Sequence, residues 1–311
     1  MQGCPTDAGK STMNTYIAKA LARGGSRGLE LRANARVERV LVEDSAAGRQ
    51  AVGTEYVDGR GERHSVRARF VVVAAGALNT PQLLIRSGLR SPEIGRHLGL
   101  HPARLVYGLF DEPQDAHRVY PISAHCMKYQ KDEDGGFIIE ASTIMDPIAF
   151  ATTIRDENGP LWGPHLVEAA RAYRRWVGLL AMVTDDNNAS IGIDVTGAAN
   201  IQVDFQPPEL ERLEAAYRFS RDVLLKSGAS RVCATGLIST HTQGGCRMGD
   251  DPVRSVVDRN CESHEVRGLF VGDASLLPRT LSVNPSLTVM ALATRLAERL
   301  SVVISDDLQH A

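Results

Sequence analysis

Two short apolar runs, far apart in this 311-residue chain, most constrain its fold. The first, Phe70 to Gly76, is apolar at every position before its glycine, and the second runs from Gly268 to Asp273. Apolar residues at successive positions fit a strand that is buried on both faces, as in a parallel sheet. A helix start follows each run, at Thr80-Pro81 and at Asn284-Pro285-Ser286. The sequence therefore predicts an α/β fold in which one sheet is interrupted by an inserted segment.

The inserted segment has a different character. Scattered alternation near 137–139 and 191–193 predicts strands, and helical spacing predicts helices over 165–178 and 209–227. Loops that contain proline and aspartate separate these elements. We expect a mixed α+β domain here, so that the chain is α+β overall.

The N-terminal part alternates helix and strand signals. A helix is expected over 11–24, where Gly24-Gly25 ends it. Alternating apolar residues from Leu29 to Val42 predict strands, and residues 52–57 and 64–68 read as a hairpin. After Thr80-Pro81 a helix is expected to continue to Gly88.

Composition excludes several classes of protein. Hydrophobic residues make up 43% and charged residues 23%, which is ordinary for a globular protein. A net charge of −2 argues against a nucleic-acid partner and gives no reason to bind an anionic membrane. The longest apolar stretch is far too short for an integral membrane segment, and no secretory signal follows Met1. Five cysteines without a CxxC pair predict free thiols in a reducing cytoplasm.

Two phosphate-binding patterns are incomplete. Gly3 to Ser11 resembles a nucleotide phosphate loop, but it has one residue too many between its glycines, and Pro5 removes a donor. A Gly-x-Gly-x-x-Gly fingerprint after a strand is absent from the sequence. We therefore expect a turn into the first helix rather than an ATP site.

Two dense motifs remain as candidate sites. Gly76 to Leu89 is an ordinary strand–helix turn or a place where backbone N–H groups meet an anionic ligand. His241 stands in a glycine-rich loop, where a histidine is more often functional than in a core, although a solvated loop histidine is equally compatible with the pattern. Asn284 is either a functional amide or only a helix cap beside Pro285. Since no further ligand stands at metal-binding spacing near Cys246, we expect no metal site.

These motifs resemble the glucose–methanol–choline (GMC) family of FAD-dependent oxidoreductases. Gly76 to Leu89 is similar to the second signature of that family, with Arg90 in place of the usual glycine. His241-x-x-Gly244, Met248-Gly249, Asp273-Ala274-Ser275 and Asn284-Pro285 match its C-terminal region in order and spacing.

The resemblance implies a partial FAD-binding, Rossmann-like domain at 1–96 that resumes at 236–311, with an inserted substrate-binding domain at 97–235. It implies that His241 and Asn284 are catalytic. The residues it places at the cofactor are Val37 at the adenine end, Ala75, Gly76, Asp273, Ala274, Pro285 and Ser286.

The implied activity is oxidation of an alcohol that is bulky, long-chain or sterol-like, in a choline-dehydrogenase-like enzyme. Electrons pass to oxygen or to another acceptor. Neutral His241 accepts the hydroxyl proton, and Asn284 donates a hydrogen bond to the substrate oxygen. The positive end of the helix at Pro285 favours negative charge on the flavin.

One departure from the family is large. The family opens with a dinucleotide fingerprint that this chain lacks, so we expect the C-terminal part of a longer enzyme, which alone binds FAD weakly or not at all. The alternative is a non-catalytic fragment or partner subunit whose FAD-binding half is a separate chain.

Overall fold

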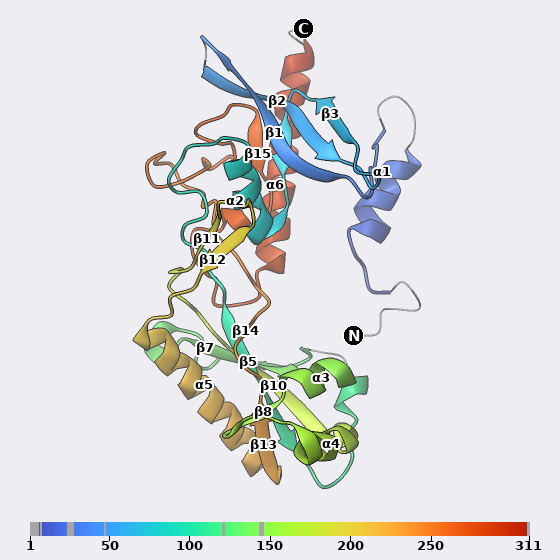
Figure 1. The fold of residues 1–311 in the computed structure, drawn as a ribbon, viewed down its shortest axis with the longest axis vertical. Coiled ribbons are helices and arrows are strands. Elements are labelled where there is room, and N and C mark those ends of the chain that lie inside the picture. The colour runs from blue at the N-terminus through green and yellow to red at the C-terminus, as the bar shows by residue number, and fades with distance from the viewer. Residues whose placement is uncertain are drawn as a thin grey trace.

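The computed structural model describes residues 6, 8–23, 28–46, 48–119, 122–142 and 146–309. Figure 1 shows two lobes: the one at the top is built largely from both ends of the sequence, and the one at the bottom from its middle. This arrangement confirms the predicted interruption of an α/β unit by an inserted segment. The domain limits at 96 and 235 stay predictions.

The two apolar runs pair as predicted. Strand β4 (Val71–Val73) lies parallel to β15 (Leu269–Val271), and Val72 is the partner of Phe270. The expectation that β4 is buried on both faces is wrong for Val72, whose side chain is 45% exposed. Val71 and Val73 face the core of the upper lobe, because alternate side chains of a strand point to opposite faces.

An antiparallel sheet covers this unit on one side. It consists of β1 (Arg36–Ser45), β2 (Gly48–Val57) and β3 (Arg63–Arg67), which confirms the predicted hairpin. The prediction of strand from Leu29 onward is wrong, since residues 29–35 lie outside any strand and Leu29 and Leu31 are exposed. Without a buried partner, alternation alone does not form a strand.

The helices of the upper lobe differ in detail from the predicted ones. The first is a π-helical segment (Met13–Ile17) that continues as α1 (Ala18–Ala22); the expected stop at Gly24-Gly25 and most of Gly3–Ser11 lie outside the described residues. Helix α2 (Gly76–Arg86) begins before Thr80-Pro81, so the predicted start there is wrong. Gly88 follows its end at a φ of +77°, as expected of a residue that ends a helix. Helix α6 (Ser286–Gln309) confirms the predicted C-terminal helix.

The lower lobe is built on one large antiparallel sheet. Its strands in spatial order are β6 (His125–Cys126), β7 (Phe137–Ser142), β10 (Trp176–Val183), β5 (Pro102–Leu109), β13 (Arg231–Ala234), β8 (Arg155–Asp156) and β9 (Gly159–Pro160), and β14 (Ile238–Ser239) pairs with β5. Helix α5 (Pro207–Lys226) packs on one face, and α3 (Pro147–Thr153) and α4 (Gly163–Arg171) pack on the other.

The α5 prediction is confirmed, but the predicted helix over 165–178 is wrong beyond Arg171. Residues Tyr173–Arg175 form a 3₁₀ turn, and Trp176 begins β10 opposite Leu109. Trp176 is fully buried in the sheet, and this tertiary burial overrides a helical pattern that was local.

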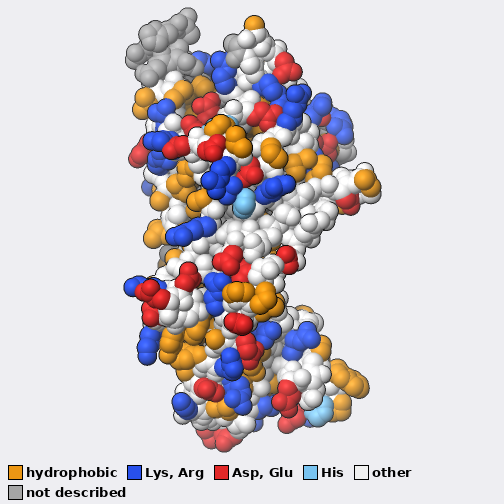
Figure 2. All heavy atoms as spheres, turned by 90° about the vertical axis from the view of Figure 1, so that its left-hand side faces the viewer, with side chains coloured by type: hydrophobic (Ala, Val, Ile, Leu, Met, Phe, Trp, Pro, Cys, Tyr) orange, Lys and Arg blue, Asp and Glu red, His pale blue; other side chains and the backbone are white. Residues whose placement is uncertain are grey.

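Smaller elements complete the fold. The hairpin β11 (Ser190–Ile193) and β12 (Ala199–Gln202) contacts α2, and the remaining 3₁₀ turns are Ala116–Arg118, Asp132–Asp134 and Ala274–Leu276. Cys126, Cys233, Cys246 and Cys261 are free thiols, and Cys4 lies outside the described residues. Among the helices of the described part, none combines the length and apolar character that crossing a bilayer requires. Figure 2 shows acidic and basic side chains interspersed over both lobes.

Candidate active site

The structure brings His241 and Asn284 together. His241 follows β14, Asn284 lies two residues before α6, and Asn284 Nδ2 is 3.4 Å from His241 Nε2. Both side chains are half-buried. An imidazole and an amide from distant parts of the sequence therefore lie in contact, and their catalytic roles stay predictions.

The loop that carries His241 is fastened by the buried side chain of Gln243. Its amide nitrogen donates to the carbonyl of His241 (3.2 Å), and its amide oxygen accepts the N–H of Leu281 (3.1 Å). The backbone of Gln243 also exchanges two hydrogen bonds with Gly99. Gln243 thus joins the His241 loop to the loop that carries Asn284. Sequence reasoning missed this residue because its role depends on contacts between distant segments.

A second histidine, His101, belongs to the site and was also missed. Its Nδ1 lies 3.1 Å from Nδ1 of His241, and its side chain is only 1% exposed. The carboxylate of Asp185 accepts the backbone N–H groups of Leu100 and His101, which holds His101 at a left-handed φ of +50°. No local pattern in the sequence predicts this position.

Burial keeps both imidazoles neutral. Desolvation, together with the nearby His241, lowers the pKa of His101 from 6.5 to about 4, and desolvation lowers the pKa of His241 as well. Near neutral pH, His241 therefore carries a lone pair that can accept a proton.

The buried His101 predicts a pH dependence of stability. Because the pKa of His101 is lower in the folded chain than in the unfolded chain, its contribution is complete above pH 6.5 and is lost as the pH falls to about 4. The loss amounts to roughly 3 kcal/mol. The free energy of unfolding, measured with urea at several pH values in this range, is expected to fall less steeply with falling pH for His101→Gln than for the wild type. Parallel curves would contradict the prediction.

Asp273 fastens the ends of the two parallel strands. Its buried carboxylate accepts hydrogen bonds from the N–H of Gly76 (2.9 Å), the hydroxyl of Thr80 (2.5 Å) and the N–H of Ser275 (2.8 Å). These bonds stabilise the first turn of α2, where the sequence predicted a later start. The contact of Asp273 and Gly76 with a cofactor stays a prediction, but the position of the Gly76 backbone depends on Asp273.

The other predicted cofactor residues lie close to this network. Ala274 accepts the N–H of Gly244 through its carbonyl (2.9 Å). Pro285 is buried and accepts the N–H of Val289, whereas Ser286 is exposed at the start of α6. Their contact with a cofactor also stays a prediction.

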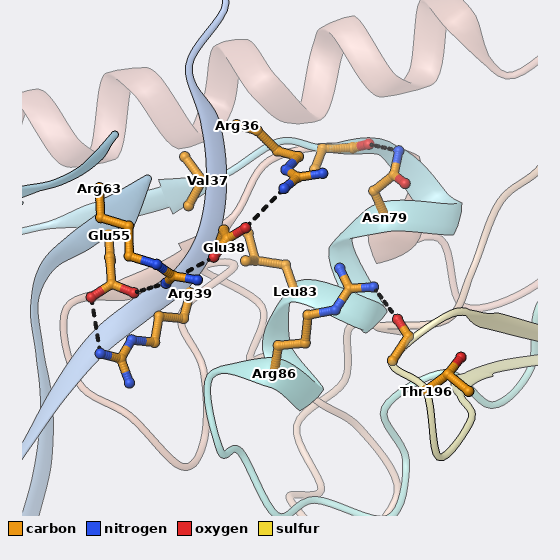
Figure 3. A pocket seen from close by; sticks show the side chains of 12 residues that line it. Arg36, Val37, Glu38, Arg39, Glu55, Arg63, Asn79, Leu83, Arg86 and Thr196 are labelled. Carbon is orange, nitrogen blue, oxygen red and sulfur yellow. Dashed lines mark hydrogen bonds and ion pairs between the residues drawn. The ribbon is translucent and has the colours of Figure 1, made fainter. Parts of the chain in front are cut away.

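A cavity of about 1000 Å³ brings Val37 and Ala75 together. Figure 3 shows it between β1, α2 and the turn after β11. Its walls are strongly charged, and the charged residues are Arg36, Arg39, Arg63, Arg86, Glu38 and Glu55. Four arginines less two glutamates leave two net positive charges. Next to Ala75, Gly76 has a φ of +84° and no heavy atom within 4 Å of the position of a Cβ. A cavity of this size with net positive charge is suited to an anionic ligand.

Three potential metal ligands lie elsewhere, at the turn between β2 and β3. The ligand atoms of Asp58, Glu62 and His64 lie within 4.8 Å of one another. The Asp58 carboxylate accepts the N–H groups of Arg60 and Glu62, which accounts for the cluster as part of the turn. We assign it no metal.

Family models and relatives agree on one family. Two models described as GMC oxidoreductase match residues 1–103 and residues 167–293. An uncharacterised GMC-type oxidoreductase of Mycobacterium tuberculosis is 31% identical over 96% of this chain and 49% of its own length. A long-chain-alcohol oxidase of Arabidopsis thaliana is 28% identical over 99% of this chain and 46% of its own length. A 2-methyl-1,2-propanediol dehydrogenase of Mycolicibacterium austroafricanum is 27% identical over 98% and 60%.

Solved structures share the fold. Pyridoxine 4-oxidase from Mesorbium loti matches with a TM-score of 0.65 at 22% identity, over 85% of this chain and 57% of that chain. Formate oxidase of Aspergillus oryzae matches with a TM-score of 0.66 at 15% identity, over 88% and 60%. The chain spans about half the length of the curated relatives it matches.

Proposed function

Because the chain belongs to the GMC oxidoreductase family, whose cofactor is FAD, we propose that it forms the catalytic part of an enzyme that oxidises the CH–OH group of an alcohol. One observation supports the proposal above all: Asn284 Nδ2 lies 3.4 Å from His241 Nε2 in a half-buried site. Burial lowers the pKa of His241 and of the neighbouring His101, which favours their neutral forms. Bound FAD supplies the hydride acceptor, which no side chain can provide.

The roles of the two residues follow from their chemistry. Nε2 of neutral His241 accepts the proton of the substrate hydroxyl as a general base. The amide of Asn284 donates a hydrogen bond to the substrate oxygen, which becomes more negative as the proton leaves. The N-terminus of α6, which begins two residues later, adds partial positive charge beside this oxygen.

The cavity at Val37 and Ala75 supports the cofactor assignment. Its two net positive charges complement the diphosphate of FAD, and the open space beside the backbone of Gly76, which follows the lining residue Ala75, permits close approach of a ligand. We assign Val37 and Ala75 to the adenosine end of the cofactor. Gly76, Asp273, Ala274, Pro285 and Ser286 are proposed to lie nearer to the reacting end.

The substrate is proposed to be an apolar, bulky or long-chain alcohol, and the electron acceptor is oxygen or another oxidant. The relatives support an alcohol, since their names include long-chain-alcohol oxidase and 2-methyl-1,2-propanediol dehydrogenase. The test is anaerobic mixing of the protein, kept loaded by excess FAD because we expect this chain alone to bind it weakly, with a panel of long-chain, branched and sterol alcohols while flavin absorbance is recorded. Bleaching by at least one alcohol supports the proposal, and a flavin that every alcohol leaves oxidised contradicts it.

The cavity assignment predicts the effect of filling it. Val37 is 39% exposed and lines the cavity, so Val37→Trp is expected to weaken FAD binding at least about tenfold. A fluorescence titration of each variant with FAD measures this effect. Val66→Trp, at an exposed position of β3 outside the cavity lining, is the matched control and is expected to bind FAD as the wild type does. Equal affinity of both variants would remove Val37 from the cofactor site.

A further inference from the structure

The parallel sheet of the upper lobe has one edge that no described strand covers. On β4, the N–H of Val71 donates to the carbonyl of Gly268. Two residues later, the carbonyl of Val73 accepts the N–H of Gly272. Successive residues of a strand direct their backbone groups to opposite edges, so the N–H and C=O of Val72 point away from β15. In the described part of the chain, β4 pairs with β15 and with no other strand.

The outer edge of β15 is closed by the loop that precedes it. The N–H of Val271 donates to the carbonyl of Cys261. The N–H of Ser263 donates to the carbonyl of Leu269. Of the two described strands of this sheet, β4 is therefore the one that keeps a free edge. A free edge presents unpaired N–H and C=O groups to which a further strand can add.

Helix α6 shows which of its two flanks lies on the side of this free edge. Leu296 is 4% exposed and points into the core of the upper lobe. Arg295 precedes it and Ala297 follows it, so these two side chains lie about 100° to either side of Leu296. Arg295 Nη1 donates to the carbonyl of Arg259 (2.6 Å), close to the loop that covers β15. The flank that carries Ala297 therefore lies on the side of β4.

That flank of α6 is apolar although much of it is exposed. Its residues, at spacings of three, four and seven, are Met290, Ala293, Ala297 and Ile304. Met290 is 54% exposed and Ile304 is 40% exposed, and the side chain of Val72 on β4 is 45% exposed. A helix face that meets water normally carries polar or charged side chains. The small side chains of Ala293 and Ala297 leave room for a second helix to approach closely.

We propose that the free edge of β4 and the apolar flank of α6 form one docking surface for a strand–helix unit of a second polypeptide. Its strand pairs with the outward backbone groups of Val72, and its helix covers Ala293 and Ala297. The polypeptide corresponds to the part of the relatives that this chain does not span. The lengths support this occupant, because the chain covers 49% of the relative from Mycobacterium tuberculosis and 46% of the oxidase from Arabidopsis thaliana.

The docked unit also completes the cavity assigned to FAD, a step that rests on the proposed function. Ala75 lines this cavity and lies two residues beyond the end of β4. In open α/β sheets, ligands bind beyond the carboxyl ends of the strands. A strand that runs parallel to β4 along its free edge ends beside the same cavity. We therefore expect the docked polypeptide to tighten the binding of FAD.

Co-expression tests the docking. The part of each of three relatives that this chain does not span is produced as a tagged polypeptide together with the full chain; the relatives are those of Mycobacterium tuberculosis, Arabidopsis thaliana and Mycolicibacterium austroafricanum. At least one polypeptide is expected to copurify with the chain as a 1:1 complex, whose mass is measured by light scattering after size exclusion. Copurification of none of the three, or a dimer of the full chain in place of the complex, would overturn the proposal.

Variants locate the surface. Met290→Lys and Ala297→Glu place charge on the apolar flank, and each is expected to weaken the complex at least about tenfold. Val72→Pro removes an N–H that takes no part in pairing with β15 and is expected to have a similar effect. Arg299→Glu, on the opposite flank of α6, is the matched control and is expected to bind as the wild type does. Without partner, Met290→Lys and Ala297→Glu are expected to unfold at the urea midpoint of the wild type, because their side chains are exposed. Undiminished binding of both variants would overturn the surface.

FAD gives the second readout. A fluorescence titration of the complex is expected to show at least about tenfold tighter FAD binding than a titration of the chain alone. A complex that binds FAD no more tightly than the chain alone would overturn the completion of the cavity. The proposed function fails separately, if the complex binds FAD and no alcohol reduces it.

Discussion

Replacing His241 with alanine in the flavin-loaded protein is expected to slow flavin reduction by an alcohol by roughly 10²–10⁴-fold. The reason is that the hydroxyl proton must leave as the hydride departs, and His241 is the neutral imidazole that lies beside Asn284. Its pKa is lowered by burial, so the base form predominates at neutral pH. Anaerobic stopped-flow measurement of flavin absorbance at saturating alcohol isolates this step.

The control for this experiment is His165→Ala, which removes an exposed histidine from α4 in the lower lobe and is expected to reduce at the wild-type rate. Added imidazole is expected to restore part of the rate of His241→Ala by entering the space of the lost ring. A reduction rate of His241→Ala within a few-fold of the wild type would assign the proton transfer to another group.

Strands and helices that a local sequence pattern indicates were predicted well. Val71–Val73 and Leu269–Val271 are short apolar runs, and their parallel pairing follows from the burial such runs require. Helix α5 was predicted from its periodicity within two residues of its observed start at Pro207. In these elements the local pattern and the tertiary environment favour the same structure.

The predictions of secondary structure fail where a contact with a distant part of the chain determines the local conformation. Helix α2 begins at Gly76 rather than at Thr80-Pro81, because Asp273 binds both Gly76 and Thr80 from far along the chain. Trp176 leaves the helical pattern because its ring is buried in the sheet beside α3 and α4. Leu29 and Leu31 have no surface to pack on and form no strand.

The residues of the candidate site also fall into a group that the sequence predicts and a group that it does not. His241 and Asn284 stand in motifs that a family resemblance makes visible, and the structure places them in contact. His101 stands in no motif, and it lies beside His241 because it directly precedes β5. A sequence pattern therefore indicates which residues react, whereas the residues that orient them depend on strand pairing that the pattern does not contain.

Removing the carboxylate of Asp273 is expected to destabilise the upper lobe strongly. The side chain is 8% exposed and accepts three hydrogen bonds, two of which join it to α2 across nearly 200 residues of chain. Hydrogen bonds to a charged group contribute about 1.5–3 kcal/mol each, and truncation also leaves their donors buried without partners. Because such contributions do not add fully, Asp273→Ala is expected to lower the free energy of unfolding by about 3–5 kcal/mol.

Urea unfolding followed by circular dichroism measures this loss of stability. Two further variants serve as comparisons for Asp273→Ala. Asp273→Asn keeps one acceptor oxygen but turns an NH₂ group toward a donor, so an intermediate loss is expected. Asp250→Ala removes a carboxylate that pairs with Arg259 on the exposed surface, and its midpoint is expected to match the wild type because solvent screens that pair. If Asp273→Ala unfolds at the same urea concentration as Asp250→Ala, the two strand ends are held by their backbone pairing, and the carboxylate has no structural role.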